Sequence, residues 1–300
     1  MYKLFGTLNI PGDKSVSHRA LILSSMSIGK SEITNLLEAD DIKATIQILK
    51  LLGITIHKKL GKWIVYGNGT NGFIQPKKDL NALNSGTTAR TMIGAVSSNP
   101  INCRFIGDKS LSKRSMSRVT EYLEKLGARF KLTKNDYLPL KTFGTSKLVP
   151  EEIIIKKPSA QIKTALIFAG LNISGKFSIR EKVLTRDHTE KLLKYLDVKH
   201  KTIKGKDGSN LIELKGPYEI YSKNIRVAGD PSSAAFFIVG ALITPGSKIT
   251  LKNVMLNPTR IEYLKILKKM GGKISVKKTD NFSGEHCGNI SVRYSKLKGI

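Results

Sequence analysis

The chain contains a repeat of roughly seventy residues, and this periodicity constrains its fold more than any other feature of the sequence. A short helix start rich in serine and threonine occurs four times, and its first residues, Ser15, Ser85, Ser159 and Ser232, are 70, 74 and 73 positions apart. The end of an amphipathic helix follows each start after 37, 41, 37 and 38 positions. Two markers that keep one phase indicate four tandem copies of a single supersecondary unit.

Hydrophobic periodicity predicts the elements within each unit. Ile42, Ile46 and Leu49 fall on one helical face, and Gly53 follows where a left-handed C-cap is expected. The alternating stretch 54–66 predicts a β-hairpin. Each unit is therefore predicted to be β-α-β-α-β-β, which makes the fold class α+β. Because such a unit buries its helices only against its copies, three units are expected to close into one domain.

Composition narrows the function classes. The net charge of +28 attracts anions, but most lysines lie singly on predicted helices and turns, which favours a solvated basic surface over a polyanion site. The longest apolar run, 234–243, is about half of the roughly 20 residues that a spanning helix needs, so we expect no membrane span. The first residues do not match the pattern of an export signal, so we expect no export. The two cysteines, Cys103 and Cys287, are too few for a disulfide framework, so we expect a reducing cytoplasm. The neighbours His286 and Cys287 have no second cysteine or histidine pair to complete a zinc site, so we expect no metal.

The start of the first repeat suits an anion. The turn 11–13 precedes Ser15, which is predicted to be the N-cap of a helix whose unpaired amides could receive a phosphate. Lys14 flanks this end, and Arg19 lies one turn further along the same face, where its planar fork could grip a phosphate or carboxylate. In isolation, these residues fit an ordinary cap with two surface cations better than an anion site.

The equivalent positions of the other repeats extend the anion hypothesis. Gly86 stands at a helix start where the missing side chain lets a ligand approach the backbone. Ser159 and Gln161 offer uncharged donors in the third repeat, and Lys163 follows Ser159 by four residues, as Arg19 follows Ser15. We predict that three helix starts converge on one ligand. In the fourth repeat Phe236 replaces the cation, so that helix is predicted to be buried scaffold.

The remaining polar candidates favour structural roles. His18 and His188 have no serine or cysteine partner in a nucleophile setting, so capping or orientation is expected. Asp40 and Asp41 open a predicted helix, where carboxylates favour the positive end of the dipole. Asp230 precedes a proline and is expected to be a turn or capping residue.

Two segments, residues 11–21 (PGDKSVSHRAL) and 84–90 (NSGTTAR), resemble the two signatures of the 5-enolpyruvylshikimate-3-phosphate synthase family. Further matches run in order through residues 107–114, 159–163, 186–190, 229–236 and 257–260. The resemblance implies the enolpyruvyl transferase fold, with a complete three-unit domain at 13–226 and a partial second domain at 1–12 plus 227–300. The family's catalytic aspartate lies beyond Ile300, so the catalytic residues are unknown here. We expect a C-terminally truncated chain that binds substrate weakly and turns over little.

The resemblance also implies an activity and its site. The family transfers the enolpyruvyl group of phosphoenolpyruvate to the 5-hydroxyl of shikimate 3-phosphate and releases phosphate, in the shikimate pathway of aromatic amino acid biosynthesis. A monomer without cofactor or metal, with no nucleic-acid or membrane partner, is expected. The residues implied for shikimate 3-phosphate are Lys14, Ser15, Arg19, Ser159, Ala160, Gln161 and Thr185. Those implied for phosphoenolpyruvate are Lys14, Gly86, Arg114 and Gln161. Leu83 and Ser115 replace the family's usual glycine and proline, so both loops are expected to sit differently.

Three alternatives compete with this activity. The related transferase that acts on a uridine-diphosphate amino sugar shares the fold, but its cysteine loop is unmatched because Cys103 lies in a predicted strand. A basic RNA-binding or RNA-end-processing protein would use the charge, but the 7% of aromatic residues give few stacking platforms. The third alternative is an inactive fragment that retains anion binding.

Overall fold

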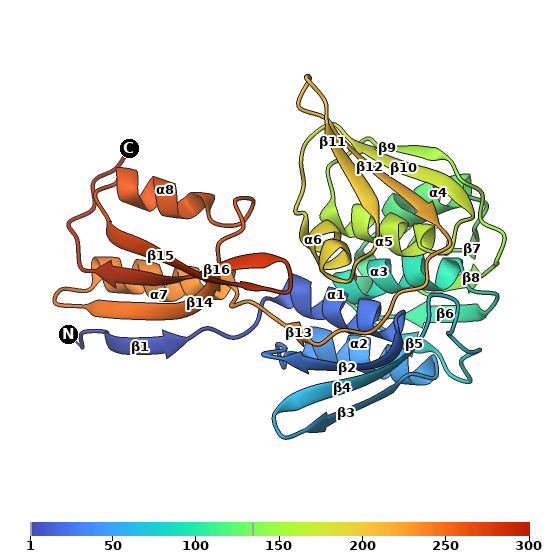
Figure 1. Cartoon of the computed structure of the whole chain (residues 1–300), viewed down its shortest axis with the longest axis horizontal. Helices are drawn as coiled ribbons and strands as arrows, with labels where there is room; N and C mark the ends of the chain where they lie inside the picture. The colour runs from blue at the N-terminus through green and yellow to red at the C-terminus, as the bar shows by residue number, and fades with distance from the viewer. Residues whose placement is uncertain (1, 134) are drawn as a thin grey trace. The chain divides into compact units, whose positions relative to one another are not determined.

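A computed structural model of the chain describes residues 2–133 and 135–300, and its elements recur in the predicted order β-α-β-α-β-β (Figure 1). The first repeat comprises β1 (Phe5–Asn9), α1 (Lys14–Ser25), β2 (Ile28–Thr34), α2 (Asp40–Leu51), β3 (Thr55–Lys59) and β4 (Lys62–Asn68). The second comprises β5 (Leu80–Asn81), α3 (Gly86–Ser97), β6 (Asn102–Ile106), a 3-10 turn (Leu111–Lys113), α4 (Ser117–Lys125), β7 (Arg129–Lys131) and β8 (Leu140–Phe143). The third comprises β9 (Glu152–Ile155), α5 (Ala160–Gly170), β10 (Gly175–Glu181), α6 (His188–Tyr195), β11 (His200–Lys204) and β12 (Asn210–Gly216). The fourth comprises β13 (Ile225–Arg226), α7 (Pro231–Ile243), β14 (Lys248–Met255), α8 (Glu262–Lys269), β15 (Lys273–Phe282) and β16 (Glu285–Arg293).

The second helix of each repeat ends as its sequence predicts. The face of α2 that carries Ile42, Ile46 and Leu49 is buried. Gly53, the first residue after its C-cap, has φ +90°, a left-handed conformation that glycine adopts without the steric penalty of a Cβ atom. The chain then turns through Leu60 into the antiparallel pair β3–β4, which confirms the predicted hairpin.

The chain forms two compact units, and it passes between them within α1, on either side of the segment Thr34–Leu37 and before β13. Unit 1 comprises the residues up to Ser17, Thr34–Leu37 and Ile225–Ile300, and unit 2 comprises His18–Ile33 and Glu38–Asn224. The division at residues 13 and 226 that the family resemblance implies remains a prediction. Among the described residues, no helix is both long and apolar enough to cross a membrane.

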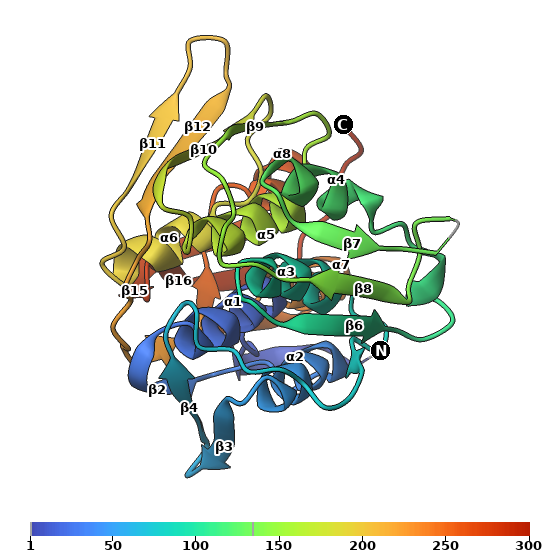
Figure 2. The same cartoon turned by 90° about the vertical axis from the view of Figure 1, so that its right-hand side faces the viewer.

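Unit 2 places helices between sheets from three repeats (Figure 2). Its sheets include the strands β2-β4-β3, β5-β6-β8-β7 and β9-β10-β12-β11 in these orders. Helices α3 and α5 pack closely in the centre, because a Cβ atom on Gly94 would lie 2.3 Å from the backbone oxygen of Ala165. This close crossing brings the helix starts of the second and third repeats together.

Unit 1 is a single sheet covered by two helices. Strand β1 pairs in parallel with β14, so the first strand of the first repeat completes the sheet β1-β14-β16-β15 of the fourth. Ala234, Ile238 and Leu242 of α7 pack against this sheet. Phe236, however, is 81% exposed, so the prediction that this helix is buried scaffold is wrong for its outer face. The helix is apolar on all sides, and such a sequence gives no periodicity from which to tell which face is covered.

Candidate anion-binding site

The start of α1 in unit 1 differs from its prediction by two residues. The helix begins at Lys14, and the amide of Val16 donates to Oδ1 of Asp13 over 2.9 Å. Asp13 is therefore the capping residue, and the prediction that Ser15 is the N-cap is wrong. Both side chains suit a cap, but Asp13 directly precedes the first helical residue, whereas Ser15 lies inside the helix. Lys14 is exposed and Ser15 half-buried at this helix start.

Arg19, further along α1 in unit 2, is held by two hydroxyl groups. Its Nε donates to Oγ1 of Thr189 over 2.8 Å and its Nη2 to Oγ1 of Thr164 over 2.6 Å. The two threonine hydroxyls are 2.8 Å apart, and Thr164 donates onward to the carbonyl of Ala160 over 2.7 Å. These contacts fix the plane of the guanidinium group, whose side chain is almost fully buried.

Gln161 joins the second and third repeats of unit 2. Its Nε2 donates to Oγ1 of Thr87 over 3.0 Å, while Nη1 of Arg90 donates to its Oε1 over 2.9 Å. The predicted convergence of helix starts therefore holds for α3 and α5. Arg90 was not singled out from the sequence, although its spacing of four residues after Gly86 repeats that between Ser15 and Arg19.

Two arginines flank Gly86 at the start of α3. A Cβ atom on Gly86 would lie 3.0 Å from Nη1 of Arg90 and 3.6 Å from Nη1 of Arg114. Arg114 is oriented by Asn84, whose Oδ1 accepts from its Nη2 over 2.7 Å. Burial lowers the pKa of Arg90, and the positive charges of Arg118 and Arg114 lower it further. An anion bound here would relieve this repulsion between cations.

Leu83 and Ser115, the two residues that depart from the family pattern, lie next in sequence to Asn84 and Arg114. Leu83 adopts a left-handed conformation with φ 51°, which a glycine at this position would adopt more easily. Its carbonyl accepts from the amide of Asp108 over 2.9 Å. The carbonyl of Ser115 accepts from Nη2 of Arg90 over 3.3 Å.

Helix α5 carries the third group of predicted residues. Ser159 caps it, because its Oγ accepts from the amide of Ile162 over 3.4 Å, and Ala160 is the first helical residue.

Thr185 lies between β10 and α6. It donates its hydroxyl proton to Oε2 of Glu181 over 2.8 Å, and its amide donates to Oε1 of the same carboxylate over 3.0 Å.

Lys163 does not match Arg19 in its surroundings. The sequence spacing suggested an equivalent anion-gripping cation, but Nζ of Lys163 lies 3.0 Å from Oε1 of Glu181 and 2.7 Å from Oε1 of Glu190. The lysine side chain is fully buried. Its charge is thus compensated by two carboxylates, and the predicted equivalence is wrong.

The other polar residues singled out in the sequence orient a ring, cap a helix or open one. Nδ1 of His18 lies 2.8 Å from Oγ1 of Thr45, a contact that orients the ring, and His188 is the buried first residue of α6. Asp40 and Asp41 open α2, as expected. Asp230 caps α7, because its Oδ1 accepts from the amide of Ser232 over 2.8 Å.

The fold and these helix starts define a class of protein. The four repeats of β-α-β-α-β-β have the architecture of the enolpyruvyl transferase fold. In this chain, arginines, hydroxyls and an amide gather at the starts of α3 and α5.

The chain belongs to the EPSP synthase (3-phosphoshikimate 1-carboxyvinyltransferase) family, which matches residues 1–298. The 3-phosphoshikimate 1-carboxyvinyltransferase of Zymomonas mobilis is 42% identical over 298 residues, covering 99% of this chain and 66% of that protein. The protein of the same name from Caldicellulosiruptor bescii is 43% identical over 299 residues, covering 99% and 68%. A solved EPSP synthase from Acinetobacter baumannii superposes with a TM-score of 0.91 and 36% identity, covering 100% of this chain and 68% of that one. The chain spans about two thirds of the length of these relatives.

Proposed function

We propose that the protein transfers the enolpyruvyl group of phosphoenolpyruvate to the 5-hydroxyl of shikimate 3-phosphate, the two substrates on which its family acts. The observation that carries the proposal is the group of cations and donors around Gly86, where Arg90 and Arg114 lie within 3.0 and 3.6 Å of the space that a side chain would fill. Phosphoenolpyruvate carries a phosphate and a carboxylate, and planar arginine forks bind both groups bidentately.

The contacts around Gly86 support the assignments to phosphoenolpyruvate. We assign Gly86, Arg114 and Gln161 to phosphoenolpyruvate, because Gln161 reaches the arginine pair through Arg90. Preorganised cations and helix amides stabilise negative charge as it develops on the departing phosphate, without reorganisation at the moment of reaction. Arg90 is added to this group as a positioning residue for Gln161.

The residues assigned to shikimate 3-phosphate are those implied by the family pattern: Lys14, Ser15, Arg19, Ser159, Ala160, Gln161 and Thr185. Arg19 is preorganised, since its fork is held by Thr164 and Thr189 before any ligand arrives. Lys14 is also assigned to phosphoenolpyruvate. The acid–base groups that protonate C3 and accept the hydroxyl proton are not assigned to any of these residues.

The setting of this activity is also a proposal. We infer a cytoplasmic monomer that needs no cofactor or metal. Two buried cysteines without a disulfide fit a reducing compartment. The positive net charge of +28 favours anionic substrates. We propose small anions rather than nucleic acid, because aromatic residues make up only 7% of the chain and offer few stacking platforms.

The test is a transfer assay at stoichiometric protein, which detects slow turnover. The chain is incubated with both substrates, and ³¹P and ¹H NMR follow phosphate release and the new carboxyvinyl ether. We expect ether and phosphate in equal amounts, and only with both substrates present. Substrates that stay unchanged although calorimetry detects their binding would overturn the transferase proposal in favour of the second candidate, an anion-binding chain without catalysis.

A further inference from the structure

The turn before α1 in unit 1 is pinned by backbone contacts to the turn before α7. The amide of Asp13 donates to the carbonyl of Ala228 over 2.8 Å, and the amide of Asp230 donates to the carbonyl of Pro11 over 2.8 Å. A side chain at Gly12 would meet the carbonyl oxygen of Asn35 at 1.9 Å, so the backbone approach requires glycine. The two helix starts are therefore held side by side by their main chains.

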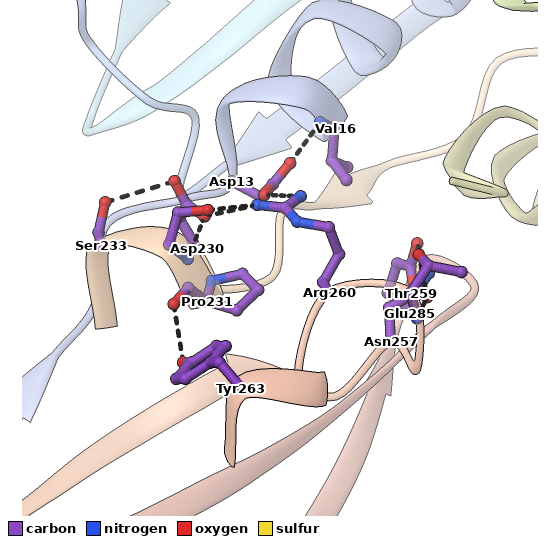
Figure 3. A network of polar contacts seen from close by, with 11 residues as sticks. Asp13, Val16, Asp230, Pro231, Ser233, Asn257, Thr259, Arg260, Tyr263 and Glu285 are labelled. Atoms are coloured by element: carbon purple, nitrogen blue, oxygen red, sulfur yellow. Dashed lines mark hydrogen bonds and ion pairs between the residues drawn. The ribbon is translucent and has the colours of Figure 1, made fainter. Parts of the chain in front are cut away.

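Each of these helix starts presents an aspartate. Asp13 caps α1 through Val16, and Asp230 caps α7 through Ser232 and also accepts from the hydroxyl of Ser233 over 3.3 Å (Figure 3). The side chain of Asp13 is 1% exposed. Two carboxylates brought this close in a buried place repel each other, and the pKa of Asp230 is raised, first by its burial and then by the charge of Asp13.

Arg260 bridges the two carboxylates, as Figure 3 shows. Its Nη1 donates to Oδ2 of Asp13 over 2.7 Å, and its Nη2 donates to Oδ1 of Asp230 over 3.0 Å and to Oγ of Ser232 over 2.9 Å. The arginine side chain is 6% exposed. A lysine could not reproduce this geometry, because a single ammonium group lacks the planar fork that serves two acceptors at once.

The loop that carries Arg260 is itself braced. Oδ1 of Asn257 accepts from both the amide and the hydroxyl of Thr259, over 3.0 and 2.8 Å, and the amide of Arg260 donates to the carbonyl of Asn257. Nδ2 of Asn257 donates to both oxygens of Glu285, which is 2% exposed. These hydrogen bonds fix the position of the loop and therefore of the Arg260 guanidinium group.

We propose that Arg260 is a positioning residue for shikimate 3-phosphate, which sets the start of α1 by holding the capping carboxylate of Asp13. The proposal rests on the proposed function, since it takes Lys14 and Ser15 as contacts of that ligand. Asp13 directly precedes these two residues, so the bond from Arg260 determines the direction of the first amides of α1. It also compensates the negative charge of Asp13, which would otherwise stand close to the phosphate of the ligand.

The first test compares Arg260→Lys and Asp13→Asn with the wild-type chain by calorimetric titration of shikimate 3-phosphate. Asparagine can still accept from the amide of Val16, so Asp13→Asn keeps the cap and removes the charge that pairs with Arg260 and repels Asp230. We expect both variants to raise the Kd by between about 10-fold and about 100-fold, as misplacement of a binding group does. Glu262→Gln is the matched control for Asp13→Asn, because it removes one negative charge from an exposed site of unit 1 and should leave the Kd unchanged.

The second test separates positioning from a purely structural role. In the double variant Asp13→Asn with Arg260→Lys, the rise in Kd should be no larger than in the more strongly affected single variant, because the two substitutions share the contact between Asp13 and Arg260. The ¹H–¹⁵N resonances of Ser15 and Val16 should respond to shikimate 3-phosphate in the wild-type chain and lose that response in the variants.

Three outcomes overturn the inference. The first is a folded Arg260→Lys or Asp13→Asn chain that binds shikimate 3-phosphate with the Kd of the wild type, whatever its melting temperature. If Arg260→Lys does not fold, Asp13→Asn alone decides. Strictly multiplicative effects of the two substitutions on the Kd also do so. A wild-type chain that does not bind shikimate 3-phosphate overturns the proposed function and this inference together.

Discussion

Replacing Arg19 by glutamine tests whether its fork binds the phosphate of shikimate 3-phosphate. Hydrogen bonds to a charged group are worth about 1.5–3 kcal/mol, so their loss should raise the Kd by about 10- to 150-fold. The fold should tolerate the change. Without Arg19, Thr189 can still donate to Thr164, and Thr164 to the carbonyl of Ala160, so neither hydroxyl is left without a partner.

Thr185→Ala supplies the comparison. The hydroxyl proton of Thr185 is already donated to Glu181, and phosphate oxygens are acceptors, so this hydroxyl has little to offer a phosphate. A neutral hydrogen bond is worth about 0.5–1.5 kcal/mol, so its loss should raise the Kd less than about tenfold. We therefore expect the effect of Arg19→Gln to exceed that of Thr185→Ala.

The assay is isothermal titration calorimetry at about 0.15 M salt, where exposed charges are largely screened beyond about 8 Å. Arg104→Gln is the matched control, because it removes the same charge from a half-exposed arginine on β6. A Kd for Arg19→Gln within about twofold of the wild-type value, with an unchanged melting temperature, would refute the role of Arg19 and the geometric reasoning behind it.

Further predictions concern the fold and its thiols. Gly94→Ala should lower the free energy of unfolding in urea by about 1–3 kcal/mol, because the new Cβ would lie 2.3 Å from a backbone oxygen of α5. Gly240→Ala is the control, and it should be neutral or stabilising because its nearest neighbour would lie at 3.4 Å. Equal effects of the two substitutions would contradict the close packing of α3 and α5. Leu60→Gly should stabilise the chain by about 0.5–1 kcal/mol in the same assay, since Leu60 has φ 49° and is 91% exposed, and a loss of stability would refute strain there. Burial raises the pKa of Cys103 and Cys287 from 9.0 to about 12, so a thiol reagent at pH 8 should label both only after unfolding. Rapid labelling of the native chain would contradict this burial. Because the raised pKa favours the protonated thiol in the folded state, its contribution to the free energy of unfolding is present below pH 9.0 and is lost as the pH rises toward about 12.

The repeat and its elements could be predicted because their signals are local. The helical face with Ile42 and Leu49 and the following Gly53 report hydrophobic periodicity and a backbone conformation within one turn of chain. The same reasoning placed Ser159 at a helix start, where it proves to be the cap, and Asp40 at the opening of a helix. Family membership likewise rests on contiguous motifs.

The surroundings of the site residues could not be predicted, since they depend on contacts distant in sequence. Lys163 repeats the spacing of Arg19, but only the fold brings Glu181 and Glu190 to its ammonium group. The error at Ser15 has a local origin: helix ends are uncertain by one or two residues, and Asp13 is an equally good cap. Arg90 was passed over because its bond to Gln161 joins two repeats.

The assignments of Lys14 and Arg19 depend on recognition of the phosphate of shikimate 3-phosphate. The direct measurement is a calorimetric titration of the wild-type chain with shikimate 3-phosphate and, under the same conditions, with shikimate, which lacks the phosphate. The cations of Lys14 and Arg19 should make the phosphorylated ligand bind at least about 100-fold more tightly, equivalent to about 2.7 kcal/mol. Equal affinities for the two ligands, or binding of neither, would contradict the account.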